Sequence, residues 1–284
     1  MKCGTASMEG RWVPSAFDAG GHHETLGVDM KFAVVNGERQ EAQPGLSGTC
    51  PSCARPVVAK CGEIKVWHWA HQGGRACDPW WENETEWHRA WKSEFPTGWQ
   101  EVVHKAENGE KHIADVRTDQ GWVIEFQYSF LQPEERRSRN AFYQHLAWVV
   151  DGTRRKRDRA QFLAALQAGV SLRSGFPIRR VYPDECALLR EWGETKAPVF
   201  FDFGDGPSLW WILAKGSSGN AYVAPFSRAD FVAIHRDGAT EMARDFQALV
   251  NDLGRLIADY ERQTTRQAPS FSMPLSRGRS RGRL

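Results

Sequence analysis

The sequence of 284 residues contains no apolar run long enough to cross a membrane, and its start lacks the hydrophobic segment of a signal peptide. It also has little net charge, because 37 lysines and arginines are set against 35 acids, which leaves +2. A strongly basic field over the whole molecule is thereby excluded, so any surface for nucleic acid must be local. We expect a cytoplasmic protein with no membrane contact.

Cysteine is scarce, with six residues in the whole chain. Thiols rarely form disulfides in the reducing cytoplasm, so we interpret these cysteines as metal ligands or buried thiols. Tryptophan is plentiful instead, with 13 residues. Most of these rings should lie in the core, although large flat rings also suit stacking on bases.

A cluster of cysteines and histidines predicts a metal site. Cys50 and Cys53 are two residues apart, a step that lets two thiolates and the amides between them bind one tetrahedral ion. Two completions of the site remain open: His68 with His71, or His71 with Cys77. Zinc fits either, because it accepts sulfur and nitrogen ligands together. A redox pair is disfavoured because no apolar helix follows the second cysteine.

Residues 113–129 predict two short strands joined by a turn at 119–121. Side chains alternate between the two sides of a strand, so Asp115 and Glu125 share one side and apolar residues take the other. Two carboxylates that face each other repel unless a cation lies between them. The pattern therefore predicts a metal site.

A helix is predicted before these strands, with Asn83 as its N-cap and Glu86 closing a capping box. Its apolar stripe recurs every four residues and consists of Trp87, Trp91 and Phe95. Glu84, His88 and Lys92 have the same spacing on the adjacent stripe. These three residues form solvent-exposed pairs, or the helix lies against the sheet and directs Glu84 and His88 at the two carboxylates.

A second helix is predicted from residue 133, followed by an apolar strand at 147–151. The order strand, helix, strand indicates a right-handed crossover and a parallel pair, so the sheet should be mixed. The basic residues that follow either contact phosphates or form a solvated helix start. They include Arg154, Arg155 and Arg157.

The part of the chain after residue 171 has a different pattern. Three strand-like runs between residues 199 and 223 are separated by Gly-rich turns, which predicts an accessory antiparallel hairpin or small sheet. A long helix is predicted over 240–262. The basic, low-complexity end of the sequence should be disordered.

An ordered series of motifs runs through residues 32–152. The motifs are C-P-S-C at 50–53, H-W-A-H at 68–71, Cys77, E-N-E-T-E-x-H-x3-K at 82–92, A-D-V at 114–116, E-F-Q-x-S at 125–129, R-x3-Y at 139–143 and W-V-V at 148–150. The series resembles the competence protein CoiA family, which joins a zinc-ribbon-like segment to a PD-(D/E)XK nuclease domain. The resemblance implies an α/β fold, with a restriction-endonuclease-like mixed β-sheet flanked by helices.

The resemblance also implies roles for individual residues. Asp115 and Glu125 resemble the metal-binding acids, and Gln127 takes the place of the motif's lysine. Glu84 resembles an additional acid on the helix. Cys77 lies where the family has its last zinc ligand, which favours Cys77 over His68.

These implications predict a nuclease that uses Mg²⁺ or Mn²⁺ to hydrolyse phosphodiester bonds in DNA, with structural zinc. We expect it to act in DNA uptake, recombination or defence, with partners from those processes. The candidate catalytic residues are Glu84, His88, Asp115, Glu125 and Gln127; those for binding nucleic acid are Lys92, Arg139, Tyr143, Arg154, Arg155 and Arg157. His88 or Lys92 is a candidate to replace the missing lysine. The alternative is a non-catalytic zinc protein that binds nucleic acid or a partner on a nuclease scaffold.

We therefore divide the chain into five parts. They are a loose leader at 1–29, a zinc-ribbon-like segment at 30–80, a PD-(D/E)XK nuclease-like core at 81–170, an accessory α+β region at 171–268 with a hairpin and helices, and a disordered basic tail at 269–284.

Overall fold

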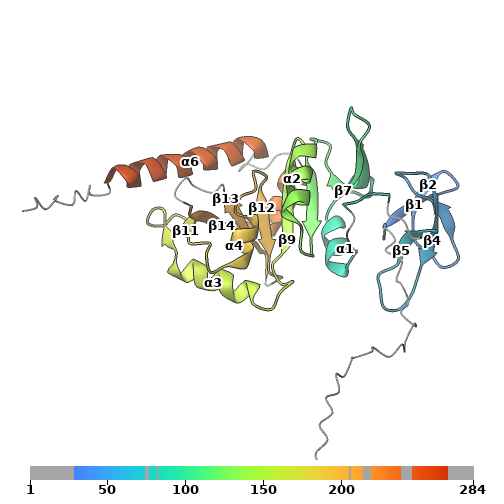
Figure 1. The fold of residues 1–284 in the computed structure, drawn as a ribbon, viewed down its shortest axis with the longest axis horizontal. Coiled ribbons are helices and arrows are strands. Elements are labelled where there is room, and N and C mark those ends of the chain that lie inside the picture. The colour runs from blue at the N-terminus through green and yellow to red at the C-terminus, as the bar shows by residue number, and fades with distance from the viewer. Residues whose placement is uncertain are drawn as a thin grey trace, which may run out of the picture.

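The computed structural model describes residues 29–73, 77–80, 82, 84–204, 206–213, 219–237 and 245–267. The predicted leader, apart from residue 29, and the predicted basic tail lie outside these residues. In the described part of the chain the strands form a five-stranded and a nine-stranded sheet, which lie next to each other along the long axis (Figure 1). The mixed α/β architecture predicted from the sequence is confirmed.

The N-terminal sheet is antiparallel and has the order β2-β1-β3-β4-β5. Its strands are β1 (Phe32–Val35), β2 (Glu38–Glu41), β3 (Ser47–Thr49), β4 (Pro56–Lys60) and β5 (His68–His71). An Asn-Gly turn joins β1 to β2, with φ of 52° at Asn36 and 87° at Gly37. A small core that includes Met30 and Trp69 fills one side of this sheet.

The large sheet is mixed and has the order β10-β11-β14-β13-β12-β9-β8-β7-β6. Its strands are β6 (Gln100–Lys105), β7 (Lys111–Arg117), β8 (Val123–Gln127), β9 (Leu146–Asp151), β10 (Val170–Ser171), β11 (Arg179–Val181), β12 (Val199–Asp202), β13 (Ser208–Leu213) and β14 (Ala221–Ser227). Strand β9 is parallel to both β8 and β12, and the predicted crossover between β8 and β9 is therefore confirmed. Every residue of β9 is buried, as expected for a central strand covered on both faces.

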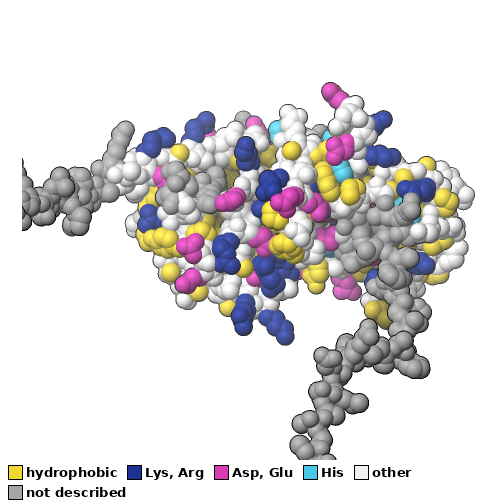
Figure 2. All heavy atoms as spheres, viewed as in Figure 1, with side chains coloured by type: hydrophobic (Ala, Val, Ile, Leu, Met, Phe, Trp, Pro, Cys, Tyr) yellow, Lys and Arg dark blue, Asp and Glu magenta, His cyan; other side chains and the backbone are white. Residues whose placement is uncertain are grey.

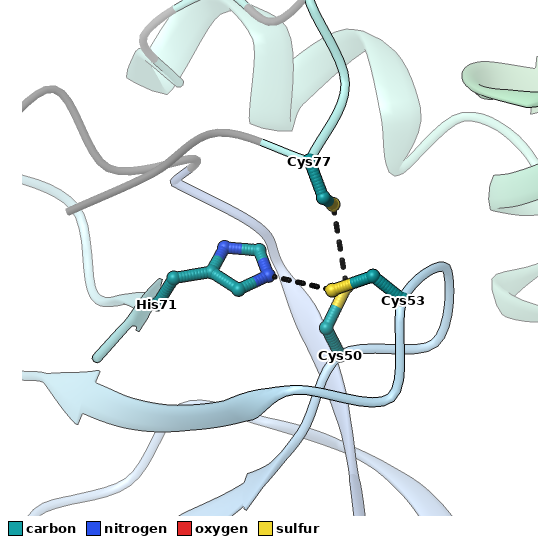
Figure 3. Close-up of side chains that lie close together, drawn as sticks. All are labelled: Cys50, Cys53, His71 and Cys77. Atoms are coloured by element: carbon teal, nitrogen blue, oxygen red, sulfur yellow. Dashed lines mark hydrogen bonds between the residues drawn. The ribbon is translucent and has the colours of Figure 1, made fainter. Parts of the chain in front are cut away.

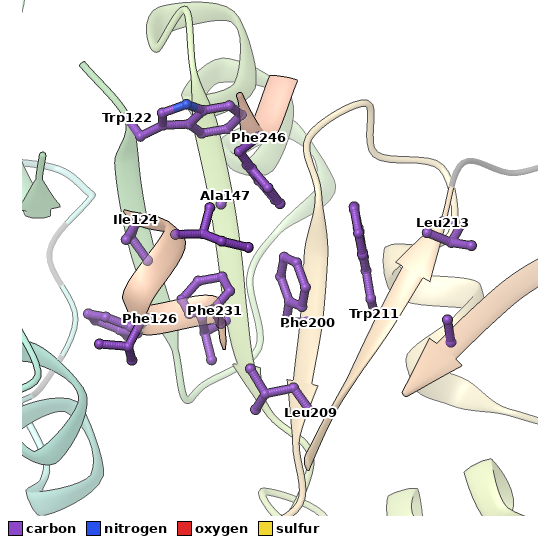
Figure 4. Close-up of a cluster of buried hydrophobic side chains, with 14 of the residues drawn as sticks. Trp122, Ile124, Phe126, Ala147, Phe200, Leu209, Trp211, Leu213, Phe231 and Phe246 are labelled. Carbon is purple, nitrogen blue, oxygen red and sulfur yellow. The ribbon is translucent and has the colours of Figure 1, made fainter. Parts of the chain in front are cut away.

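Helices cover both faces of the large sheet. They are α1 (Glu86–Lys92), α2 (Pro133–Phe142), α3 (Asp158–Ala168), α4 (Ala187–Trp192), α5 (Arg228–Asp237) and α6 (Phe246–Gln267), with a short 3-10 helix at Thr97–Trp99. One core lies under α1, α5 and α6, where Phe231 and Phe246 meet side chains of the central strands (Figure 4). The other core lies under α2, α3 and α4 and contains Phe162 and Trp192. None of the described helices combines the length and apolarity needed to cross a membrane.

Two predictions about local structure were wrong. The strands after residue 171 do not form a separate hairpin or small sheet, because β12 pairs with β9 and extends the large sheet. Helix α1 is capped by Thr85 instead of Asn83, since the Thr85 hydroxyl accepts a hydrogen bond from the amide of His88 at 3.3 Å. His88, the third residue of this helix, is buried and bonds to the carbonyl oxygen of Phe126 in β8.

His235 on α5 gives the fold a testable pH dependence. Burial among Phe231, Trp122 and Phe246 lowers the pKa of His235 to about 4. The unfolded chain therefore binds more protons below pH 6.5, and this histidine should cost about 2 kcal/mol of stability between pH 7.5 and pH 5. We expect His235→Leu to lose less stability than wild type over that range in urea unfolding. Equal losses of stability in wild type and variant would contradict the lowered pKa of His235.

Candidate functional site

Four residues of the N-terminal sheet and the segment after it converge on one point. Cys50 and Cys53 lie in the turn between β3 and β4, His71 ends β5, and Cys77 comes from the following segment (Figure 3). Their ligand atoms all lie within 4.8 Å of one another. Among the residues that the structure describes, this is the one group of three or more potential ligands that meets this distance.

The distances within this group fit a tetrahedral ion. The sulfur atoms of Cys50 and Cys77 are 3.7 Å apart, and the sulfur of Cys53 lies 3.2 Å from Nε2 of His71. Zinc–sulfur bonds of about 2.3 Å imply ligand separations of roughly 3.8 Å. The group is therefore compatible with structural zinc. His68 is not part of this group. Its Nδ1 donates to the carbonyl oxygen of Val66 at 2.8 Å, and its Nε2 lies 3.2 Å from Oδ1 of Asp29.

The turn that carries the first two ligands is shaped for anionic sulfur. The amide of Ser52 donates to the sulfur of Cys50 at 3.4 Å, and Ala54 adopts a left-handed φ of 59° that closes the turn. The hydrogen bond between the sulfur atoms of Cys77 and Cys50, together with the neighbouring amides, lowers the pKa of Cys50 to about 5. A thiolate at this position is the form that binds a metal.

Three carboxylates form a row across neighbouring strands of the large sheet. The pairing of Gln100 with Val116 and of Val102 with Ala114 puts Glu101 of β6 opposite Asp115 of β7. The pairing of β7 with β8 continues the row to Glu125. The prediction that Asp115 and Glu125 lie on the same side of adjacent strands is thus confirmed. These acids line a pocket that also receives Glu84 and Lys92.

Strands β7 and β8 separate at this row. Their pairing runs through Val116 and Ile124, and beyond it the carboxylate of Asp115 accepts the amide of Phe126 at 2.9 Å. The side chain of Asp115 therefore takes the place of a backbone acceptor. It remains 22% exposed, so its second oxygen faces the pocket.

The ammonium group of Lys92 is the cation of this pocket. It lies 3.0 Å from Asp115, 3.1 Å from Glu101 and 3.2 Å from Glu84. Burial by itself lowers the pKa of Lys92, but the three carboxylates outweigh it and hold that pKa well above the ordinary value. Lys92 is therefore charged, and it in turn lowers the pKa of Asp115 against the effect of burial.

Glu125 is paired with a different cation. Its Oε2 accepts from Nη1 of Arg139 at 2.8 Å, whereas its Oε1 is buried without a hydrogen-bond partner among the described residues. Burial and the charge of Asp115 raise the pKa of Glu125 to about 8, despite the neighbouring arginine. The unpartnered oxygen is a candidate ligand position for an added cation.

The other predicted catalytic residues have mostly supporting contacts. The ring of His88 donates through Nε2 to the carbonyl oxygen of Phe126 at 2.9 Å and accepts at Nδ1 from the Thr85 hydroxyl. Both nitrogens are engaged, so His88 fixes β8 and offers no free base. Gln127 is buried, and its side-chain amide donates to Glu82 at 2.9 Å and to the carbonyl oxygen of Ser129 at 3.2 Å.

Most residues predicted to bind nucleic acid are not available at the surface. Lys92, Arg139 and Tyr143 are buried, which does not fit phosphate-binding side chains on an open face. Arg154 and Arg155 are paired with Glu191. Arg157 is exposed. On the face drawn in Figure 2, basic and acidic side chains are interspersed, in agreement with the small net charge.

Two acids of this region, Glu101 and Glu82, were not among the predicted site residues. Glu101 has a left-handed φ of 47°, a conformation that costs about 1–3 kcal/mol and is typical of functional sites. Its carboxylate accepts the amides of Lys31 and Phe32, which joins the N-terminal sheet to β6. Glu82 accepts the amide of Ser129. Its place in the E-N-E-T-E motif was a signal, but sequence spacing does not show which acid faces β8.

The fold and the two sites define a protein in which a cysteine-rich sheet able to hold a metal adjoins a mixed α/β domain with an acidic pocket. The family model described as "Competence protein CoiA, N-terminal domain" matches residues 45–79. This match includes all four residues of the Cys/His group and supports the resemblance to the CoiA family; it ends before the strands of the acidic pocket. No curated protein and no solved structure matches the chain significantly.

The ligand set of the Cys/His group can be tested by metal analysis. We expect the purified protein to contain about one zinc ion per chain, since four-ligand structural sites retain zinc. His71→Ala should lose most of it, and His68→Ala should keep it because His68 is outside the group. Zinc loss in the His68 variant alone would reverse the assignment.

Loss of the positive charge of Lys92 should destabilise the protein. Lys92→Met leaves three carboxylates without their shared partner, and loss of one partner from a buried ionic network typically costs about 3–5 kcal/mol. Lys105→Met, at an exposed position of β6, should change stability by less than about 0.5 kcal/mol. Urea unfolding of both variants measures the difference, and similar small effects would show that the pocket does not depend on Lys92.

Proposed function

We propose that the protein is a metal-dependent nuclease that hydrolyses phosphodiester bonds in DNA. The observation that carries this proposal is the convergence of Asp115 and Glu125 on adjacent strands of one acidic pocket. The match of residues 45–79 to a competence protein family supports a competence-related function, in which DNA is the expected substrate. Roles in recombination or defence use the same chemistry.

The donor set of the pocket suits a hard divalent cation. Carboxylate oxygens are the ligands that Mg²⁺ and Mn²⁺ prefer, and Mg²⁺ is commonly bound by one or two carboxylates with water and substrate phosphate completing its shell. Asp115 and Glu125 would hold the ion, and the unpartnered Oε1 of Glu125 fits that role. When bound, the ion would lower the pKa of a water ligand and offset charge that grows on the scissile phosphate.

Lys92 is the residue of this chain that best replaces the motif's lysine. Gln127 is neutral and donates to Glu82, so it brings no positive charge to the pocket. The ammonium of Lys92 contacts Asp115 from helix α1 and carries the charge that position 127 lacks. Lys92 would orient Asp115 and supply positive charge beside the metal-binding acids. Arg139 keeps Glu125 in place from α2.

A second candidate function follows from the same ion pairs. Lys92 and Arg139 already neutralise part of the charge on Asp115 and Glu125. A pocket compensated in this way can persist as a scaffold without catalysis, and the protein would then bind DNA or a partner. Binding of labelled DNA with no cleavage in Mg²⁺ or Mn²⁺ would favour this function.

A cleavage assay separates the two functions. Wild type should cleave one or more of single-stranded, double-stranded and branched DNA in Mg²⁺ or Mn²⁺. Asp115→Asn should reduce the rate on the order of 100-fold or more, because it removes a charged metal ligand. Asp119→Asn is the matched control, since Asp119 is exposed in the turn after β7. Equal cleavage by wild type and the Asp115 variant would remove the catalytic assignment.

A further inference from the structure

The segment at residues 77–84 runs from the Cys/His group to the acidic pocket. It begins at Cys77, one of the four potential metal ligands, and reaches Glu84, which contacts Lys92. Between these two ends the structure describes Asp78, Pro79, Trp80 and Glu82. We call the described residues of this stretch, Cys77, Asp78, Pro79, Trp80, Glu82 and Glu84, the connecting segment.

Asp78 joins the connecting segment to β7 by hydrogen bonds. It is only 4% exposed, and its Oδ2 accepts the amide of Ile113 at 2.7 Å. Its Oδ1 accepts from Nδ1 of His112 at 2.8 Å and from the amide of Trp80 at 2.9 Å. Ile113 lies two residues before Asp115 on the same strand. A fixed Asp78 therefore limits movement of the strand that carries the first acid.

Trp80 links the connecting segment to Glu125 through Arg139. Its ring stacks on His112 with centroids 3.2 Å apart, and its carbonyl oxygen accepts from Nη2 of Arg139. The same guanidinium donates through Nη1 to Glu125. The position of Arg139, and through it that of Glu125, thus depends on the backbone of the connecting segment.

Glu82 fastens the segment to the end of β8. Its Oε2 accepts from the side-chain amide of Gln127 at 2.9 Å, and its Oε1 accepts from the amide of Ser129. These contacts begin two residues after Glu125. Asp78 and Glu82 therefore hold the two strands that carry Asp115 and Glu125, on the side where those strands separate.

We propose that metal binding by Cys50, Cys53, His71 and Cys77 sets the geometry of the acidic pocket through the connecting segment. Ligation of Cys77 fixes one end of the segment and removes the entropy that it would otherwise keep. Asp78 and Glu82 are positioning residues that pass this constraint to β7 and β8. The proposal rests on metal binding by the Cys/His group and is independent of the proposed nuclease activity.

Hydrogen exchange of the full chain, measured by mass spectrometry, tests the proposal. The samples are zinc-loaded wild type, chelator-treated wild type, Cys77→Ser and the control Cys61→Ser, whose cysteine is outside the ligand group. We expect zinc removal and Cys77→Ser to speed exchange about tenfold or more at the amides of Ile113 and Ser129. Peptides from β12 and β13, and all peptides of the Cys61 variant, should exchange as in zinc-loaded wild type.

Two further variants distinguish local positioning from general loss of structure. Asp78→Asn should keep zinc and speed exchange at Ile113, and Glu82→Gln should keep zinc and speed exchange at Ser129. Unchanged exchange at both amides after zinc removal would overturn the proposal. An equal increase over the whole nine-stranded sheet would also overturn it, because the constraint would then be global. Backbone exchange is readable whether or not the protein cleaves DNA.

Discussion

The buried ammonium of Lys92 is the interaction on which the acidic pocket depends. Three carboxylates, from Glu84, Glu101 and Asp115, meet there at the end of helix α1, and each would repel the others in a medium of low dielectric. One charged lysine offsets this repulsion and lets the three side chains lie close to one another. The pocket can therefore keep a set of oxygen ligands beside two separated strands, which is the chemical requirement of a divalent cation site.

Residues next to the N-terminal sheet and residues of the large sheet both line this pocket. The carboxylate of Glu101 accepts amides at the start of the N-terminal sheet, and the connecting segment returns from the Cys/His group to β7 and β8. Covalent continuity and hydrogen bonds thus couple a potential metal centre to the acids of the large sheet. The cysteine-rich sheet is better understood as part of the pocket's support than as an independent attachment.

Much of the fold was predictable, because the spacing of apolar residues along a strand or helix and the residue types of turns are local properties of the sequence. Alternation put Asp115 and Glu125 on one side of adjacent strands, and the order of elements gave the parallel pairing of β8 with β9. The continuation of the sheet through β12 was not predictable, since the pairing partner of an apolar strand is chosen by packing. The burial of Arg139 and Tyr143 was not predictable either. The helix that precedes Tyr143 has charged residues around it, so its sequence does not show which face covers the sheet.

The sequence by itself determined the ligand types and their spacing: a C-x2-C step, a later histidine and cysteine, and two acids ten residues apart with a turn between them. Covalent spacing and strand periodicity are sufficient for that. Only the tertiary structure decided that Cys77 and not His68 completes the group, that Lys92 lies among the acids, and that Asp78 and Glu82 hold the acids' strands. Those outcomes depend on contacts between segments distant in sequence, where burial and electrostatic compensation select one arrangement.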